Sequence, residues 1–317
     1  MSMNRAQFAK MLEPGLNTLF GLEYDRYPPE YEAVFSSNTS AKAFEEDVLL
    51  QGFGNAPTKD EGASISYDSA SQQWTARYQH ETIALAFSIT EEAEEDGLYG
   101  SIASRYTKAL ARSMASTKEI KAANILNNAT SNTDPYGGGD GVSLLSTAHP
   151  THNGNQSNTL ATAADLSETS LESMLIQISD MKDDRGLRIA AQGTTLIIPP
   201  AYTFVAERLL ESQLRTGTAD NDINAIRSGG YLPQGYHIMR RLTDSDAFFI
   251  LTDVPDGLKM FQRSPMKKGM EGDFETGNVR YKVRERYSFG FTDWRGRFGT
   301  EGAAEFVNLE RGLVPSS

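Results

Sequence analysis

The chain has 317 residues, of which 39% are apolar and 23% charged, and it contains four histidines and no cysteine. This length predicts about two domains, and the composition excludes collagen, coiled coils and wholesale disorder. The absence of cysteine excludes disulfides, thiolate zinc sites, iron–sulfur clusters and cysteine nucleophiles. No run reaches the ~18 apolar residues of a membrane helix, and the first residues lack the apolar core of a signal peptide. We therefore expect a protein that is neither inserted in a membrane nor exported.

The net charge of −12 is concentrated in the first third of the chain. Residues 1–100 hold 17 acidic against 6 basic residues, whereas residues 259–297 hold 10 basic against 5 acidic residues. An acidic front and a basic rear predict attraction between parts of the chain or between copies of it. They do not favour nucleic-acid binding, because domains that bind nucleic acid are usually basic overall.

The N-terminal part is predicted to be an arm followed by a long β-hairpin. Residues 1–60 contain Pro-Gly, Pro-Pro and a Ser/Asn/Thr cluster, so only short pieces such as 4–12 and 40–50 are expected to be helical. Residues 62–90 are predicted to form the hairpin, because their second half alternates apolar and small or polar residues. The first limb, residues 64–78, is polar, so the hairpin needs a partner surface.

A long helix and a compact α/β segment are predicted next. Apolar residues recur every four positions over most of residues 91–129, and the acidic first turn suits the positive end of a helix dipole. A polar loop over residues 131–158 separates this helix from the next elements. The α/β segment is predicted to contain a helix at 167–183, a buried strand at 194–198 and a helix at 201–213.

The C-terminal part is predicted to be β-structure. Residues 247–252 and 258–263 flank an Asp-Gly pair, which is a strong signal for a hairpin turn. Residues 279–291 alternate at period two, with mostly apolar odd positions interrupted by Glu285. The even positions begin with four bases, which we call the basic ladder: Arg280, Lys282, Arg284 and Arg286.

The sequence contains no motif for catalysis or for a bound cofactor. It has no P-loop, no HExxH helix and no GxSxG nucleophile turn. His149 and His152 could share a metal ion only with a further ligand nearby, and the proline between them in a polar loop favours a turn. We therefore predict no catalytic, cofactor-binding or metal-binding residues.

Two groups of residues are predicted to lie at protein interfaces. The first comprises the aromatic residues of the polar limb and the base beside them: Tyr67, Trp74, Arg77 and Tyr78. These rings could stack on nucleic-acid bases, but a single basic residue among them favours anchors in a protein interface. The basic ladder could grip phosphate, but the negative charge of the whole chain favours the carboxylates of the acidic front as its partners.

The order of these elements resembles the major capsid proteins of tailed bacteriophages, which have the Hong Kong 97 fold. ITEEAEEDGLYGSIASRYTKALARSMASTKEIKAANILNNA (89–129) resembles the spine helix of that family with the end of its hairpin. DGVSLLSTAHP (140–150) resembles a loop of Mu-like major head subunits. The C-terminal run that ends in Asp-Trp-Arg-Gly (293–296) is similar to the strands of the family's peripheral domain.

The resemblance implies an α+β fold of four parts, which are an N-arm (1–61), an E-loop (62–90), a discontinuous peripheral domain (91–154 and 247–317) and an inserted α/β axial domain (155–246). It implies a structural subunit, not an enzyme, that assembles in the host bacterial cytoplasm into hexamers, pentamers and the shell of the virion. The shell encloses phage DNA without sequence-specific binding. The further partners that it implies are a separate scaffolding protein, a portal and a decoration protein. A cellular nanocompartment shell of the same fold, and a hydrolase or nucleic-acid-binding protein on an α/β scaffold, are the alternatives.

Overall fold

The computed structural model of the chain divides into two compact units. Unit 1 comprises Met1–Leu144 with Pro255–Gly296, and unit 2 comprises Leu145–Val254 with Arg297–Ser317. The residues that the structure describes are 5–90, 99–214, 222–272 and 278–303. Each unit combines helices with strands, so the predicted α+β class holds within each of them.

The main sheet of unit 1 has four strands. In sheet order they are β1 (Ser36–Thr39), β10 (Leu258–Gly272), β11 (Val279–Phe291) and β4 (Glu81–Ile89). β11 is antiparallel to both β10 and β4, whereas β1 is parallel to β10. The predicted strand at 279–291 is confirmed with these same bounds, and the alternation of buried odd and exposed even positions follows its first half.

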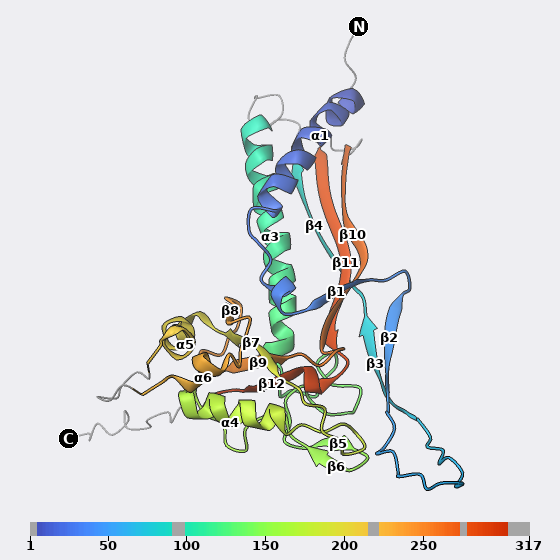
Figure 1. The fold of residues 1–317 in the computed structure, drawn as a ribbon. Helices are drawn as coiled ribbons and strands as arrows, with labels where there is room; N and C mark the ends of the chain where they lie inside the picture. Colours follow the sequence, from blue (N-terminus) through green and yellow to red (C-terminus); the bar gives the residue numbers. More distant parts are fainter. Residues whose placement is uncertain (1–4, 91–98, 215–221, 273–277, 304–317) are drawn as a thin grey trace, which may run out of the picture. The chain divides into compact units, whose positions relative to one another are not determined.

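One long helix, α3 (Tyr99–Asn127), runs along the sheet of unit 1 (Figure 1). It confirms the predicted helix from residue 99 onward, while residues 91–98 lie outside the described part of the chain. The core between helix and sheet consists of apolar side chains from α1, β4, α3 and β11: Leu16, Phe20, Ile89, Ala103, Leu110, Ala111, Met114, Tyr281 and Val283. Burying one large apolar side chain stabilises a fold by about 1.5–3 kcal/mol, so this cluster accounts for the position of α3.

The first described element, α1 (Arg5–Tyr24), is a helix of 20 residues, and the prediction of an arm without a continuous helix is wrong there. The helix passes through Pro14, although an interior proline costs about 3 kcal/mol. Leu16 and Phe20, four residues apart, are buried against α3 and the sheet. Their burial offsets the cost of the proline, which a pattern within one segment does not show. The short helix η1 (Tyr31–Ala33) follows.

A second pairing in unit 1 corrects the predicted hairpin at 62–90. β2 (Phe44–Leu50) pairs antiparallel with β3 (Gln72–Gln79), whereas β4 pairs with β11. β3 and β4 are separated by His80 alone, and an antiparallel turn needs about two residues, so these strands do not pair with each other. The short helix expected at 40–50 is also wrong, because β2 occupies most of that segment.

Unit 2 is built on a second sheet of four strands. In sheet order they are β12 (Arg297–Thr300), β9 (Phe248–Thr252), β7 (Gly193–Ile198) and β8 (Tyr236–Ile238). The helices of this unit are α4 (Glu168–Ser179), η2 (Pro200–Tyr202), α5 (Thr203–Glu211) and α6 (Ala225–Gly229). The predicted helices at 167–183 and 201–213 and the predicted strand at 194–198 are confirmed to within a few residues. A small pair, β5 (His149–Thr151) and β6 (Gly154–Gln156), lies in the loop that follows α3.

The hairpin predicted around Asp256 and Gly257 is wrong as a pairing. β9 pairs with β7 and β12, whereas β10 pairs with β1 and β11. Asp256 has a positive φ of 63°, so the Asp-Gly pair still makes a turn. The turn therefore connects strands of two different sheets instead of closing a hairpin. The short helix η3 (Trp294–Gly296) ends unit 1 before β12.

Candidate functional site

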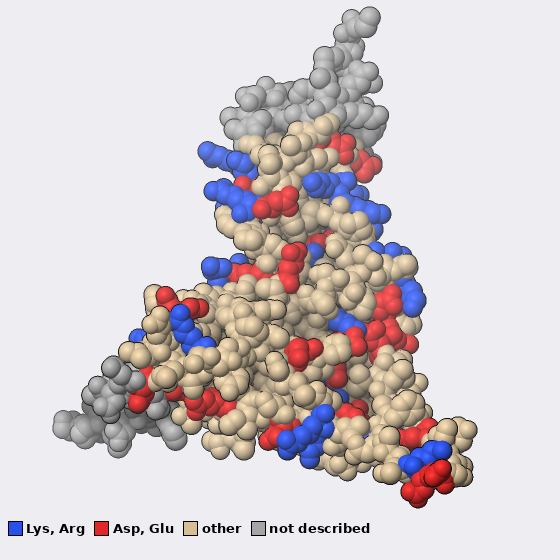
Figure 2. Space-filling model, viewed as in Figure 1, with Lys and Arg blue, Asp and Glu red and all other residues tan. Residues whose placement is uncertain are grey.

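The hairpin β2–β3 extends away from the main sheet of unit 1 and ends in a long loop, residues 51–71 (Figure 1). The loop carries exposed apolar side chains, and Tyr67 is 95% exposed. It also carries exposed charges of both signs, seen as red and blue atoms at its free end (Figure 2). Asp60 and Glu61 are its adjacent acidic pair. A loop with exposed rings and no core of its own is a surface for another molecule.

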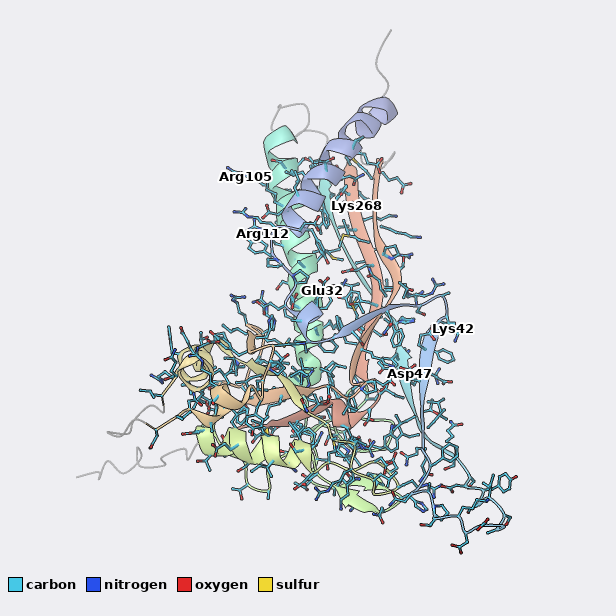
Figure 3. All side chains as sticks on the ribbon, in the orientation of Figure 1. Glu32, Lys42, Asp47, Arg105, Arg112 and Lys268 are labelled. Carbon is cyan, nitrogen blue, oxygen red and sulfur yellow. The ribbon has the colours of Figure 1, made fainter. Side chains whose placement is uncertain are left out.

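The base of the hairpin is held to the sheet by a connected set of polar bonds. Asp47 on β2 accepts a bond from Lys259 at 2.6 Å and another from the Thr292 hydroxyl at 3.0 Å. Thr292 Oγ1 lies 2.6 Å from the Tyr78 hydroxyl, and Lys259 also pairs with Asp256 at 2.6 Å. Asp47 is labelled at this position in Figure 3. The charged bond between Asp47 and Lys259 is of the stronger kind, so the base of the hairpin is fixed while its loop is exposed.

The aromatic side chains of β3 reinforce this base. Tyr78 is only 3% exposed, and its ring packs edge-on against Phe261 with centroids 4.8 Å apart. A Cβ at Gly290 would lie 2.8 Å from the Tyr78 ring, so the ring requires a glycine there. The indole of Trp74 donates to the carbonyl of Thr292 at 3.2 Å.

The prediction that Tyr78 anchors an interface with another molecule is therefore wrong. Its ring is buried within unit 1 because β3 packs against β10 and β11. Trp74 is likewise bonded within its own unit. Arg77 is exposed, lies 4.0 Å from Glu46, and its guanidinium sits 4.0 Å from the Phe44 ring centroid. That Tyr67 lies at an interface with another molecule remains a prediction, because its side chain is 95% exposed.

A buried histidine joins the hairpin to the sheet. His80 Nε2 lies 3.0 Å from the Ser40 hydroxyl, and Nδ1 lies 3.0 Å from the Ser288 hydroxyl. The Ser40 hydroxyl donates in turn to Glu45 at 2.7 Å, so His80 Nε2 carries the proton that Ser40 accepts. Burial lowers the pKa of His80, and the nearby Arg286 lowers it further.

The exposed face of β11 is strongly basic in its first half, although Glu271 on β10 lies directly opposite Arg280. Arg280, Lys282 and Arg284 are exposed on β11, beside small or uncharged β4 residues such as Ala84 and Ala86. The opposite face of β11 supplies Tyr281 and Val283 to the core. The basic ladder therefore points away from the core, as its alternation predicts, although Arg286 is only partly exposed.

Two further bases enlarge this surface. Lys267 on β10 lies directly opposite Arg284 in the register, and Arg263 lies in the bulged part of β10 next to Ser264. The Nε atoms of Arg263 and Arg286 are buried without a hydrogen-bond partner among the described residues. We call these residues together the basic face: Arg263, Lys267, Arg280, Lys282, Arg284 and Arg286.

The sequence did not predict that Arg263 and Lys267 belong to the basic face. The only available signal was the Lys267-Lys268 pair just beyond the predicted strand at 258–263. β10 continues to Gly272, but register shifts near Ser264 decide which of its bases lie on the exposed face.

The candidate metal ligands His149 and His152 do not belong to a ligand cluster in the described part of the chain. There, no group of three or more His, Cys, Asp or Glu side chains could hold a metal ion. His149 is fully buried, with Nε2 3.1 Å from the side-chain oxygen of Asn158. His152 lies in the exposed turn between β5 and β6. No described helix has the length and apolar character of a membrane span.

Comparisons with known proteins were made for sequence and for structure. The family described as phage capsid protein matches residues 74–298. A comparison with curated protein sequences found no match.

Solved structures share the fold at low sequence identity. The capsid of an empty GTA particle has a TM-score of 0.58 at 9% identity, over 87% of this chain and 90% of that chain. The capsid of a native GTA particle has a TM-score of 0.51 at 11% identity, over 88% and 92%. A structure of Microbacterium phage Oxtober96 has a TM-score of 0.50 at 11% identity, over 87% and 91%.

The family match covers more than half of the chain, and the structural matches extend the shared fold to most of its length. The family match favours a virion shell over a cellular nanocompartment, and over a hydrolase or a nucleic-acid-binding protein. The chain belongs to the phage capsid protein family, and it is a structural major capsid protein with a Hong Kong 97-like fold.

Proposed function

We propose that copies of this capsid protein join by docking the 51–71 loop of one copy onto the basic face of another. The loop offers the Asp60-Glu61 pair and the exposed ring of Tyr67. The basic face offers cations beside small side chains of β4, which leave room for a neighbouring loop. Complementary charge of this kind sets the register and the rate of association more than the affinity.

One observation carries the proposal: Lys267 and Arg284 are directly opposite each other on adjacent strands. Like charges at such positions destabilise a sheet. Neither side chain forms an ion pair with a carboxylate from the described residues of its own copy. The repulsion is relieved when carboxylates from another copy lie between the two cations.

The wider assembly follows from repetition of this contact. We propose that the subunits form hexamers and pentamers that close into a shell, since a repeated contact in a closed symmetric assembly needs only a small free energy per copy. The shell encloses DNA without reading its sequence, and the subunit has no catalytic role of its own. A scaffolding protein, a portal and a decoration protein remain proposed partners, and assembly is proposed to occur in the host cytoplasm.

The domain assignment becomes a proposal with altered bounds. We propose that the E-loop comprises residues 44–79, in place of 62–90, and the pairing of β2 with β3 supports this proposal. The stretch Leu145–Val254 of unit 2 corresponds to the proposed axial domain. Helix α3 and the main sheet form the proposed peripheral domain. The predicted axial insertion at 155–246 lies inside the span Leu145–Val254 of unit 2.

The test reverses charge on the basic face and then restores complementarity. Lys282→Glu with Arg284→Glu changes two exposed side chains, so the melting temperature of the subunit should change by less than about 2 °C. The variant should form few or no shells in electron micrographs. Adding Asp60→Lys with Glu61→Lys to the same chain should restore shells, because every copy then carries both reversed surfaces.

The matched control is Arg105→Glu with Lys108→Glu, which makes the same change of charge on α3. Arg105 points away from the sheet (Figure 3) and both residues are exposed. This control should assemble normally. Normal shells from the Lys282/Arg284 variant would show that the basic face is exposed to solvent and makes no contact that assembly needs. Failure of the four-site variant to assemble would show that Asp60 and Glu61 are not its partners.

A further inference from the structure

Arg297, the first residue of β12, is a completely buried arginine. Its exposed fraction is 0%. Its backbone is fixed on two sides, because it pairs with Leu251 on β9 and its carbonyl accepts a bond of 3.0 Å from the Asn158 side chain. These two contacts fix the strand that carries the buried side chain.

The guanidinium of Arg297 has no hydrogen-bond partner within the described part of the chain. All three of its nitrogens, Nε, Nη1 and Nη2, are buried and unpartnered there. Arg295 gives a direct contrast, because it is also buried but lies 3.3 Å from the carboxylate of Asp293. Arginine has five N–H donors and no acceptor, so none of the donors of Arg297 is satisfied by the described residues.

An isolated buried cation of this kind is costly. Moving an ion from water into a protein interior is strongly unfavourable even after relaxation, unless a partner compensates its charge. Burial lowers the pKa of Arg297 to about 9, so the group still carries its charge at neutral pH. Water could fill the empty donors, but it would leave the charge without a counter-ion.

We infer that the guanidinium of Arg297 binds a small inorganic anion of the halide class, such as chloride. An anion satisfies both needs at once, because it neutralises the charge and accepts several N–H bonds. The site has no exposed surface, which favours a compact monatomic ion over phosphate or a carboxylate from another molecule.

The test compares the melting temperature of the subunit in chloride and in gluconate at constant ionic strength. Gluconate is a much larger anion than chloride. Binding to the folded state alone raises stability with anion concentration, so the native subunit should melt about 2–4 °C higher in chloride. Arg297→Met, which keeps an unbranched chain without charge, should melt at the same temperature in both salts. The control Arg105→Met should keep the full chloride effect.

Crystals grown in bromide provide a readout that does not depend on a variant. The inference expects an anomalous peak within hydrogen-bond distance of the Arg297 guanidinium. A site without such a peak would overturn it, as would a native melting temperature that is equal in chloride and gluconate. An Arg297→Met variant that keeps the chloride effect would overturn it too, because the effect would then arise elsewhere on the protein.

Discussion

The ammonium group of Lys118 lies 3.5 Å from the Glu285 carboxylate, with both side chains 5% exposed or less. Lys118 comes from α3 and Glu285 from β11, so the pair connects the long helix to the main sheet. The Lys118 nitrogen also lies 5.3 Å and 5.2 Å from the ring centroids of Tyr31 and Tyr287. Burial raises the pKa of Glu285, and the charge of Lys118 acts against that shift. The acid that interrupts the apolar face of β11 thus has a specific cationic partner.

Removing one partner of this pair should strongly destabilise unit 1. Lys118→Met leaves the Glu285 carboxylate buried without its cation, which should lower the free energy of unfolding by about 3–5 kcal/mol. Urea denaturation followed by circular dichroism measures the loss. The double variant Lys118→Met with Glu285→Met should recover much of it, because no charge is then buried.

A nearby exposed pair supplies the control for this prediction. Lys121 lies 2.6 Å from Glu81, and both side chains are substantially exposed. Lys121→Met should therefore cost about 1 kcal/mol or less. Equal losses for Lys118→Met and Lys121→Met would contradict the role of burial.

Adding a methyl group at Gly290 should loosen the base of the hairpin. The new Cβ would lie 2.8 Å from Tyr78 Cε1, and overpacking of this kind costs about 1–3 kcal/mol. Thermal unfolding of Gly290→Ala measures the effect. Combining it with Tyr78→Leu should give a cost well below the sum of the two single changes, because the ring that clashes is gone.

The control for Gly290 is Gly269→Ala on β10. There the nearest atom to an added Cβ is Lys282 Cε at 3.6 Å, an ordinary contact distance. This variant should be neutral or slightly more stable. A Gly290→Ala protein as stable as the native one would mean that Tyr78 is not tightly packed against this strand.

Acid should weaken the contacts by which His80 connects the hairpin to the main sheet. Burial lowers the pKa of His80 in the folded protein, Arg286 and Arg263 lower it further, and Glu45 acts in the opposite direction. The unfolded chain has an ordinary histidine pKa of about 6.5, so it binds more protons than the folded chain just below that pH. The His80 contribution is therefore complete above about pH 6.5 and is lost as the pH falls through the lower pKa of the folded state.

The measurement is the unfolding free energy of the native protein and of His80→Gln between pH 7.5 and 5. Glutamine keeps hydrogen-bonding groups near Ser40 and Ser288 but does not titrate. The native protein should lose more stability than the variant over this range, and the difference between the two profiles isolates His80. Parallel profiles would assign the acid sensitivity to other groups.

Sequence patterns within one segment predicted the elements that depend on that segment alone. α3 follows from the recurrence of apolar residues every four positions, and β11 follows from an alternation at period two that only Glu285 interrupts at the odd positions. The exposure of Arg280, Lys282 and Arg284 follows from the same alternation, because the odd positions of β11 enter the core.

Patterns of this kind did not identify which segments would meet. β3 and β4 were both recognisable as strands, but their partners, β2 and β11, are set by the packing of whole faces. The helix at Pro14 depends on burial against α3, which is more than 80 residues away in the chain. An aromatic residue such as Tyr78 looks the same in sequence whether it packs on its own chain or on another copy.

The hairpin loop should become protected only when subunits assemble. Tyr67 and the rest of the 51–71 loop are exposed, and few backbone hydrogen bonds hold the loop, whereas β2 and β3 pair along their length. In the free subunit, hydrogen exchange should therefore be fast over 51–71 and slow over the paired parts of 44–79. In assembled shells the exchange of the 51–71 amides should slow at least tenfold if the loop docks on a neighbouring copy.

Tyr67→Ala should leave the melting temperature of the subunit unchanged, because the side chain is 95% exposed, yet reduce the yield of shells. Equal exchange of the loop in subunit and shell would contradict docking, and normal shell yield from Tyr67→Ala would limit the contact to the charged residues of the loop.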